Sequence, residues 1–294
     1  MNTKERLTIQ AVSRRCGVNP VTLRAWERRY GLIRPARTER GHRRYNEADV
    51  ARIRSILAWL DRGLPISQVR AVLERGEAPG AVTGPWHQAM EEARVALDDL
   101  NVRRLEQLFR RLTGDYPLEQ VVNGWCEPLR SHLQMPGRIA ARALFDSFLR
   151  QKLSGPLLAA APSRRQHGWL VMAVGDPLPA MFQAALSEVP VWTLVLPVAG
   201  AELGAWLSHS HLDGLLWVLG EHPGRRQSNR LWPERMPDSG LALWCCGPAL
   251  TGELRTPEWL TRCPGGFAEV AGAMSDWSAT MAAGRADHAS DLVP

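Results

Sequence analysis

The chain has 294 residues, of which 45% are hydrophobic and 22% charged, as in a globular protein long enough for two or three domains. No stretch approaches the ~20 apolar residues of a membrane span, and the first ten residues lack the apolar run of a secretory signal. Five cysteines without a Cys-x-x-Cys pair argue against a disulfide scaffold. We therefore expect a cytoplasmic protein without a membrane partner.

Positive charge is concentrated at the start of the chain, although the net charge of the whole is only +6. Residues 1–75 hold 17 arginines and lysines against 7 acidic residues, whereas the remainder holds 19 against 23. A codon bias toward arginine would enrich the whole chain and would not leave the remainder acidic. The asymmetry therefore predicts that the first quarter binds a polyanion such as nucleic acid.

Two short helices are predicted within this basic region. Gly17 ends the first, and Asn19 with Pro20 begins the second, because Asn is a good N-cap and Pro suits the first helical position. In the second helix Leu23 and Trp26 pack inward. The face left to point outward consists of Thr22, Arg24, Ala25, Arg28 and Arg29. A helix that presents arginines beside small residues can enter the major groove of DNA.

A basic hairpin and two more helices follow. Pro35 and Gly41 are turn residues within 32–45. The cationic side chains of this segment are Arg37, Arg40, His42, Arg43 and Arg44. Such a hairpin is typical of a wing that grips the DNA backbone. Asn46 is expected to cap a third helix and Ser67 to start a fourth. Residues 6–75 therefore predict a winged helix-turn-helix domain.

Three segments, TLRAWERRYGL (22–32), GHRRY (41–45) and NEADVARIR (46–54), resemble the MerR family of transcription regulators in order and spacing. The resemblance implies a homodimer that binds double-stranded promoter DNA, acts with RNA polymerase and typically activates transcription by twisting the promoter. The resemblance also implies that Trp26 faces the DNA. The predicted DNA-binding residues are Asn19, Thr22, Arg24, Ala25, Trp26, Arg28, Arg29, Arg37, Arg40, His42, Arg43 and Tyr45.

The middle of the chain is predicted to be helical. Residues 76–84 combine Gly, Pro and Ala with little charge, and are interpreted as a linker. Apolar residues then recur at helical spacing. Breaks at Asn101, at 114–117 and at 136–137 divide residues 85–154 into a four-helix bundle.

The pattern of hydrophobic residues changes at residue 168. Short, nearly continuous apolar runs at 168–175, 191–198, 214–220 and 241–247 are typical of strands buried on both faces of a parallel sheet. Residues 167–277 therefore predict a five-stranded flavodoxin-like α/β domain closed by a helix at 266–277. We expect residues 278–294 to form a disordered tail. The fold class is mainly α plus α/β.

A helical bundle followed by an α/β domain is similar to the cobalamin-binding, light-sensing MerR regulators of the CarH and LitR type. Those proteins carry Asp-x-His-x-x-Gly after the first strand. Here Leu178 replaces the histidine that ligates cobalt, and Met181 replaces the glycine. The bundle's Glu-His pair falls near Arg142 and Ala143. We therefore disfavour a cobalamin-dependent photoreceptor or a remnant cobalamin enzyme, and expect no cofactor.

Residues 114–134 resemble the branch of the family that contains the curli and biofilm activator MlrA. That resemblance implies a C-terminal region that receives its signal from a protein partner, such as a diguanylate cyclase or phosphodiesterase of cyclic-di-GMP signalling. A small-molecule ligand in the degenerate cobalamin pocket remains an alternative. The sequence shows no phosphate loop, nucleophile elbow or His-Glu-x-x-His motif, so we expect no enzyme.

A metal- or thiol-sensing regulator is a further alternative. Its candidate ligands are Cys245, Cys246, Cys263, His209 and His211. Adjacent cysteines at the end of an apolar strand are more often a packing choice, and they point to opposite faces of the sheet. We therefore expect no metal site.

Overall fold

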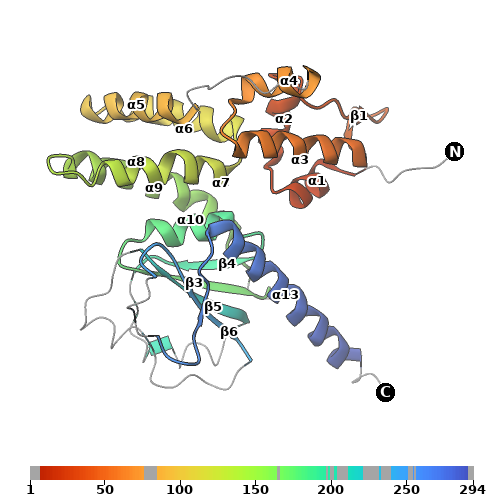
Figure 1. Cartoon of the computed structure of the whole chain (residues 1–294). Helices are drawn as coiled ribbons and strands as arrows, with labels where there is room; N and C mark the ends of the chain where they lie inside the picture. Colours follow the sequence, from red (N-terminus) through yellow and green to blue (C-terminus); the bar gives the residue numbers. More distant parts are fainter. Residues whose placement is uncertain are drawn as a thin grey trace. The chain divides into compact units, whose positions relative to one another are not determined.

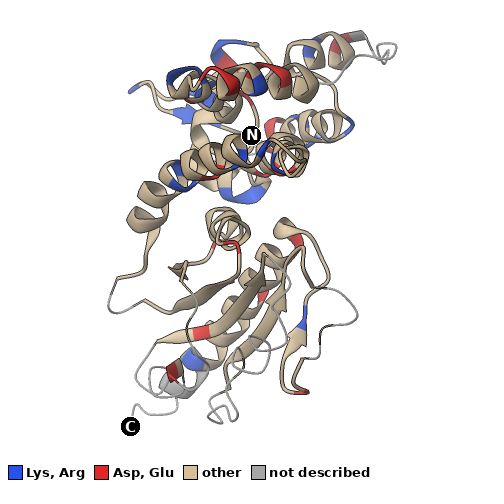
Figure 2. Cartoon of the chain, turned by 90° about the vertical axis from the view of Figure 1, so that its left-hand side faces the viewer, with Lys and Arg blue, Asp and Glu red and all other residues tan. Residues whose placement is uncertain are grey.

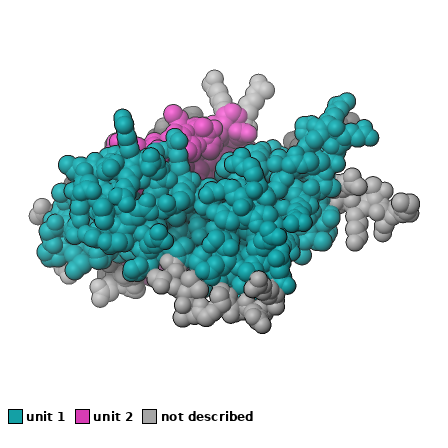
Figure 3. Space-filling view, turned by 90° about the horizontal axis from the view of Figure 1, so that it is seen from above, with its two compact units in different colours: residues 1–145 teal, residues 146–294 magenta. Residues whose placement is uncertain are grey.

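The computed structural model describes residues 7–75, 85–163, 166–196, 198, 202–203, 211–220, 232, 240–250, 254 and 256–290. The chain divides into two compact units, residues 1–145 and 146–294 (Figures 1 and 3). The predicted linker at 76–84 lies outside the described residues.

The first unit begins with the predicted winged helix-turn-helix. Its elements are α1 (Ile9–Cys16), α2 (Pro20–Arg28), β1 (Ala36–Arg37), β2 (Arg43–Arg44), α3 (Glu47–Asp61) and α4 (Ile66–Arg75). Asn19 caps α2, because its side chain accepts a hydrogen bond from the Val21 N–H at 2.8 Å. Asn46 and Asp49 form a reciprocal capping box at the start of α3. The predicted starts of both helices are confirmed.

A short antiparallel hairpin forms the wing. Strand β1 pairs with β2 in the register Ala36 with Arg44 and Arg37 with Arg43. Tyr45 then forms an antiparallel bridge with Leu7, through two backbone hydrogen bonds of 2.8 and 3.0 Å. This bridge fixes the base of the wing beside the start of α1.

Residues 85–160 are helical, and their breaks lie where the sequence predicts them. The elements are α5 (Pro85–Asp98), α6 (Val102–Asp115), α7 (Leu118–Val121), the π-helical turn η1 (Val122–Cys126), α8 (Glu127–His132) and α9 (Ile139–Ala160). Trp125 of η1 is fully buried and packs edge-on against Phe145, with ring centroids 5.2 Å apart. Helix α9 begins in the first unit and continues into the second.

The winged helix-turn-helix and the following helices belong to one compact unit, not to the two separate domains (6–75 and 85–154) that the sequence predicts. Helix α2 contacts the C-terminal end of α6. The Trp26 indole N–H donates to the backbone carbonyl of Asp115 at 2.8 Å, and the Ile66 N–H donates to the Tyr116 hydroxyl at 3.3 Å. Helix α2, which the sequence predicts to read DNA, is therefore packed directly on the helical segment.

The second unit contains the predicted five-stranded parallel sheet. Its elements are β3 (Gly168–Val174), α10 (Leu178–Leu186), β4 (Val191–Leu194), β5 (Leu212–Leu219), β6 (Ala242–Cys246), β7 (Thr261–Arg262) and α13 (Phe267–Ser290). The strand order is β4-β3-β5-β6-β7, with every pair parallel. This is the flavodoxin-like order 2-1-3-4-5, which confirms the predicted fold class.

The closing helix is longer than the sequence analysis predicts. Helix α13 runs to Ser290, so the expected disordered tail is wrong for residues 278–290. The Ser278 hydroxyl and Arg285 both donate to the carboxylate of the buried Asp213, at 2.8 and 2.9 Å. These bonds anchor the second half of α13 to the start of β5, which the composition of the tail did not reveal.

Candidate nucleic-acid interface

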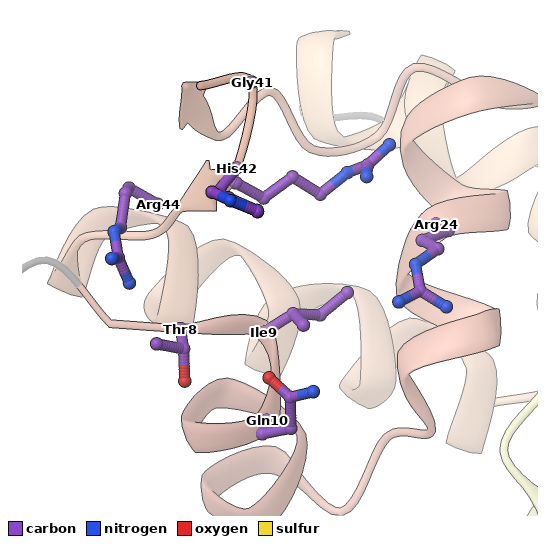
Figure 4. A pocket seen from close by; sticks show the side chains of 8 residues that line it. Thr8, Ile9, Gln10, Arg24, Gly41, His42 and Arg44 are labelled. Atoms are coloured by element: carbon purple, nitrogen blue, oxygen red, sulfur yellow. The ribbon is translucent and has the colours of Figure 1, made fainter. Parts of the chain in front are cut away.

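Cationic residues gather on the first unit, whereas the described part of the second unit carries few (Figure 2). On the first unit, a hollow of about 370 Å³ lies between the start of α1, the side of α2 and the wing. It is lined by Thr8, Ile9, Gln10, Arg24, Gly41, His42, Arg43 and Arg44. Figure 4 shows that Arg24 projects from α2 toward this hollow, with Ile9 and Gln10 below it and His42 on the wing side. Three elements therefore place polar and cationic groups around one concave surface.

The exposed face of α2 is narrower than the sequence predicts. Arg24 and Arg28 lie on this face and are exposed, as is Val21. The predicted residue Asn19 is also exposed, but its side-chain oxygen is used to cap the helix. Arg24 and Arg28 thus form the accessible cationic part of the helix.

Thr22 and Ala25 are buried, so their expected outward position is wrong for this structure. Trp26 is buried as well, which agrees with its predicted inward packing but not with the DNA-side position that the family resemblance implies. The physical reason is the docking of α6 along this flank of α2. The Thr22 hydroxyl donates to the Thr113 carbonyl at 3.3 Å, and Trp26 donates to the Asp115 carbonyl. The same flank holds Arg29, which stays partly exposed but forms an ion pair with the Asp115 carboxylate.

Asp115 is a buried carboxylate that joins the recognition helix to α6. Burial raises the pKa of the Asp115 carboxyl, although hydrogen bonds from Tyr30 and Arg29 act in the opposite direction. Burial, together with the nearby Asp115 charge, also raises the pKa of Tyr30 to about 12. Through its ion pair with Arg29, Asp115 offsets the charge of one of the arginines that the sequence assigns to DNA.

Glu27 connects α2 to the wing. Its carboxylate accepts hydrogen bonds from Arg37 at 2.8 Å and from Arg43. Partial burial opposes ionisation of Glu27, but the bonds from Arg43 and Arg37 outweigh it and lower the pKa of the carboxyl. Glu27 is therefore ionised at neutral pH and holds the wing against the helix.

The remaining wing residues differ in accessibility. Arg40 and His42 are exposed at the tip of the hairpin. Tyr45 is fully buried, and its hydroxyl has no hydrogen-bond partner among the described residues. Burial raises the pKa of Tyr45 to about 12. The expected surface position of Tyr45 is therefore wrong in this structure, because its bridge to Leu7 directs the ring into the core.

Sequence reasoning missed four residues of this region. Thr8 and Gln10 line the hollow from the start of α1, and neither is among the DNA-binding residues predicted from the sequence. Glu27 and Asp115 organise the arginines around them. A signal for Glu27 existed, since it is the one acidic residue within TLRAWERRYGL. No local signal pointed to Asp115, which lies 86 residues from Arg29.

The comparisons with known proteins agree with this geometry. The model of the MerR HTH family regulatory proteins matches residues 7–76. The HTH-type transcriptional regulator MlrA of Salmonella typhimurium (strain LT2) is 35% identical over 172 residues, which are 57% of this chain and 68% of the relative. MlrA of Escherichia coli K12 is 35% identical over 170 residues, with the same coverage. The chain belongs to the MerR family.

A second branch of the family is also similar. The HTH-type transcriptional repressor CarH of Myxococcus xanthus is 29% identical to this MerR-family chain over 170 residues, which are 52% of the chain and 57% of CarH. The chain is thus a MerR-type DNA-binding transcriptional regulator, and its relatives are named regulators rather than enzymes.

The segment after β3 does not fit cobalamin in this MerR-family protein. Leu178 is fully buried at the position of the expected histidine ligand, and Met181 is 4% exposed at the position of the glycine. Asp176 accepts a hydrogen bond from the N–H of Leu178, the first residue of α10, at 3.1 Å. A leucine has no lone pair for cobalt, and a buried methionine fills the space that a cofactor tail needs.

Cys245 and Cys246 of the second unit are buried, whereas Cys263 is half-buried. Cys245 and Cys246 belong to the apolar clusters on opposite faces of the sheet, which confirms the packing interpretation. Burial raises the pKa of Cys245 to about 11 and that of Cys246 further. His211 packs against His167, with ring centroids 5.2 Å apart, and His209 lies outside the described residues. Within the described ranges, no three side chains are grouped as metal ligands.

None of the helices in the described part of the chain has both the length and the apolar character needed to cross a bilayer.

Proposed function

We propose that this MerR-family regulator reads promoter DNA through Arg24 and Arg28 of α2, while Arg40 and His42 of the wing contact the backbone. The observation that carries the proposal is the hollow between α1, α2 and the wing, because it places Arg24 beside the amide of Gln10 and the cationic wing. Arginine pairs with guanine and glutamine with adenine in the major groove. Thr8 and Arg44 at the rim would position the phosphates.

The regulator is proposed to act as a homodimer on an inverted repeat, because one short recognition helix reads too few base pairs alone. By likeness to its family, it would work with RNA polymerase as an activator on promoters in the cytoplasm. The second unit would then receive the signal.

Substitution of Arg24 tests the proposed base contact. In a titration of the full chain, we expect Arg24→Ala to reduce the preference for its promoter over random duplex by about 5- to 150-fold, since one bidentate pair is worth ~1–3 kcal/mol of discrimination. Arg40→Ala is expected to weaken binding to both duplexes equally and to lower the salt slope by about 1.

The matched control is Arg150→Ala, which removes an exposed arginine of α9 and should leave both affinities unchanged. Full retention of promoter preference in Arg24→Ala would show that α2 does not read bases through this residue.

For the signal, we propose a protein partner that binds the second unit, with the cyclic-di-GMP enzymes as the first candidates. The buried Leu178 and Met181 support this choice over cobalamin. We expect the immobilised full chain to retain a purified diguanylate cyclase or phosphodiesterase, and its promoter affinity to change when the enzyme is added. If a small molecule raises the unfolding temperature and neither enzyme is retained, the input is a ligand instead.

A further inference from the structure

The turn that follows α5 holds Leu100 in a left-handed backbone conformation, which is unfavourable for any residue other than glycine. The Leu100 N–H donates to the Leu97 carbonyl at 3.2 Å, and the Asn101 N–H donates to the Ala96 carbonyl at 2.7 Å. This is the Schellman pattern, whose left-handed position normally holds glycine. Leu100 occupies it with a φ of 53°, and among the described residues it is the one non-glycine with positive φ. Its side chain is nevertheless 75% exposed.

Three more exposed apolar side chains lie at the same end of the helical segment. Val102 begins α6, Met135 lies in the connection between α8 and α9, and Ile139 begins α9. Arg138 forms an ion pair with Asp98, which ties this connection to the end of α5. We call Leu100, Val102, Met135 and Ile139 the apolar tip. It holds four of the eight large exposed hydrophobic residues in the described part of the chain.

The charges beside the apolar tip also oppose local stability. Asp99 follows the last turn of α5, where the helix dipole disfavours an acid, and Arg103 lies in the first turn of α6, where it disfavours a base. Both residues are exposed, and neither has an ion pair within the described ranges, whereas Asp98 is paired with Arg94 and Arg138. Asp99 precedes Leu100 in the chain and Arg103 follows it. In a dimer with two-fold symmetry, Asp99 of each copy can therefore lie against Arg103 of the other copy.

The position of the apolar tip suits a dimer on DNA. Helix α6 separates Leu100 from Asp115, which contacts α2, and its 14 residues are about 21 Å long. Two copies that meet at their tips with their α6 helices end to end would place their two Asp115 residues, each in contact with α2, about 40 Å apart. Half-sites that lie one turn apart on DNA are ~34 Å apart, so a modest bend at the contact matches the two distances.

We infer that the apolar tip is the contact between two copies of this chain, with Leu100 at its centre and Asp99 of each copy against Arg103 of the other. The inference rests on the proposed homodimer and names its surface. It explains why a strained, exposed leucine stands where a glycine would give a more stable monomer.

Sedimentation of the full chain tests the contact. We expect Leu100→Gly to raise the unfolding temperature of the first unit by about 2–4 °C, because the left-handed strain is relieved. The same variant should weaken the dimer at least tenfold. This combination separates loss of the contact from loss of folding. Leu100→Asp should be monomeric under the same conditions.

Charge reversal provides the matched controls. Asp99→Arg and Arg103→Asp each improve the interaction with a helix dipole, so both should fold normally while they weaken self-association. An equimolar mixture of the two variants should dimerise again, as should the double variant. If dimerisation is restored neither in the mixture nor in the double variant, the predicted pairing of Asp99 with Arg103 is overturned.

The remaining outcomes are distinct. A wild-type chain that stays monomeric both free and on a two-half-site duplex would overturn the contact together with the proposed homodimer. A wild-type dimer that persists in Leu100→Asp would overturn the contact alone, since another surface would then hold the dimer. Binding of monomeric Leu100→Asp to a single half-site would show that the proposed DNA-reading function survives without the contact.

Discussion

Replacement of Trp26 by alanine is expected to unfold the DNA-reading region and to abolish promoter binding. Trp26 is fully buried, and its indole N–H is bonded to the backbone of α6. Removal of a buried tryptophan costs ~3–5 kcal/mol, which is a large part of the ~5–15 kcal/mol that stabilises a domain. Thermal unfolding monitored by circular dichroism, together with titration of promoter DNA, measures both effects.

Trp26→Phe is the matched control. It keeps most of the buried ring but loses the hydrogen bond to the Asp115 carbonyl, so we expect a cost of about 1 kcal/mol and retained DNA binding. If Trp26→Ala folded normally and failed only to bind DNA, the ring would have to contact DNA directly. That result would restore the family-based prediction for this residue.

The second large effect is an asymmetry between the two partners of the Arg29–Asp115 ion pair. We expect Arg29→Ala to destabilise the first unit by about 2 kcal/mol, because it leaves a buried carboxylate with less compensation. The value is below the ~3–5 kcal/mol of a fully buried pair, since Arg29 is 44% exposed and partly screened. Asp115→Asn should cost less than about 1 kcal/mol, because it removes the buried charge and leaves Arg29 in water.

The pH dependence of stability follows from the raised pKa of Asp115. In the folded state the Asp115 carboxyl keeps its proton up to a higher pH than it does in the unfolded chain, where aspartates titrate near pH ~4. The stabilisation is therefore fully present below that value and is lost as pH rises through the folded pKa. We expect this loss in the wild type and its absence in Asp115→Asn.

Chemical denaturation at several pH values compares the three proteins. Equal destabilisation by Arg29→Ala and Asp115→Asn would contradict the account, because it would mean that the pair contributes as a simple exposed salt bridge. Asp115→Asn also frees Arg29 from its ion pair, so a gain in salt-dependent DNA affinity is expected in the same variant.

Much of the architecture was accessible from the sequence because it depends on local chemistry. Asn19 and Asn46 mark helix starts through hydrogen bonds to the next few residues, and the breaks at Asn101 and at 136–137 mark helix ends. The apolar runs after residue 168 predicted buried parallel strands, because continuous hydrophobicity fits a sheet covered on both faces.

The composition of the DNA-facing surface was less accessible. Helical periodicity places Thr22, Ala25 and Arg29 on an outward flank of α2, but it does not reveal that the end of α6 covers that flank. This contact joins residues about 90 positions apart across a segment that resembles a linker. The prediction for the second half of α13 was wrong for the same reason, because Asp213, which anchors it, lies in a strand that is distant in the sequence.

The bridge that Glu27 makes to Arg37 and Arg43 has a consequence for target choice. These ion pairs hold the wing at a fixed distance from α2. The protein therefore sets the distance between the groove that α2 enters and the DNA strand that the wing contacts. DNA must then supply the matching width, and sequences whose stiffness resists that width pay a deformation energy. The regulator would thus discriminate among sites at base pairs that none of its side chains reaches.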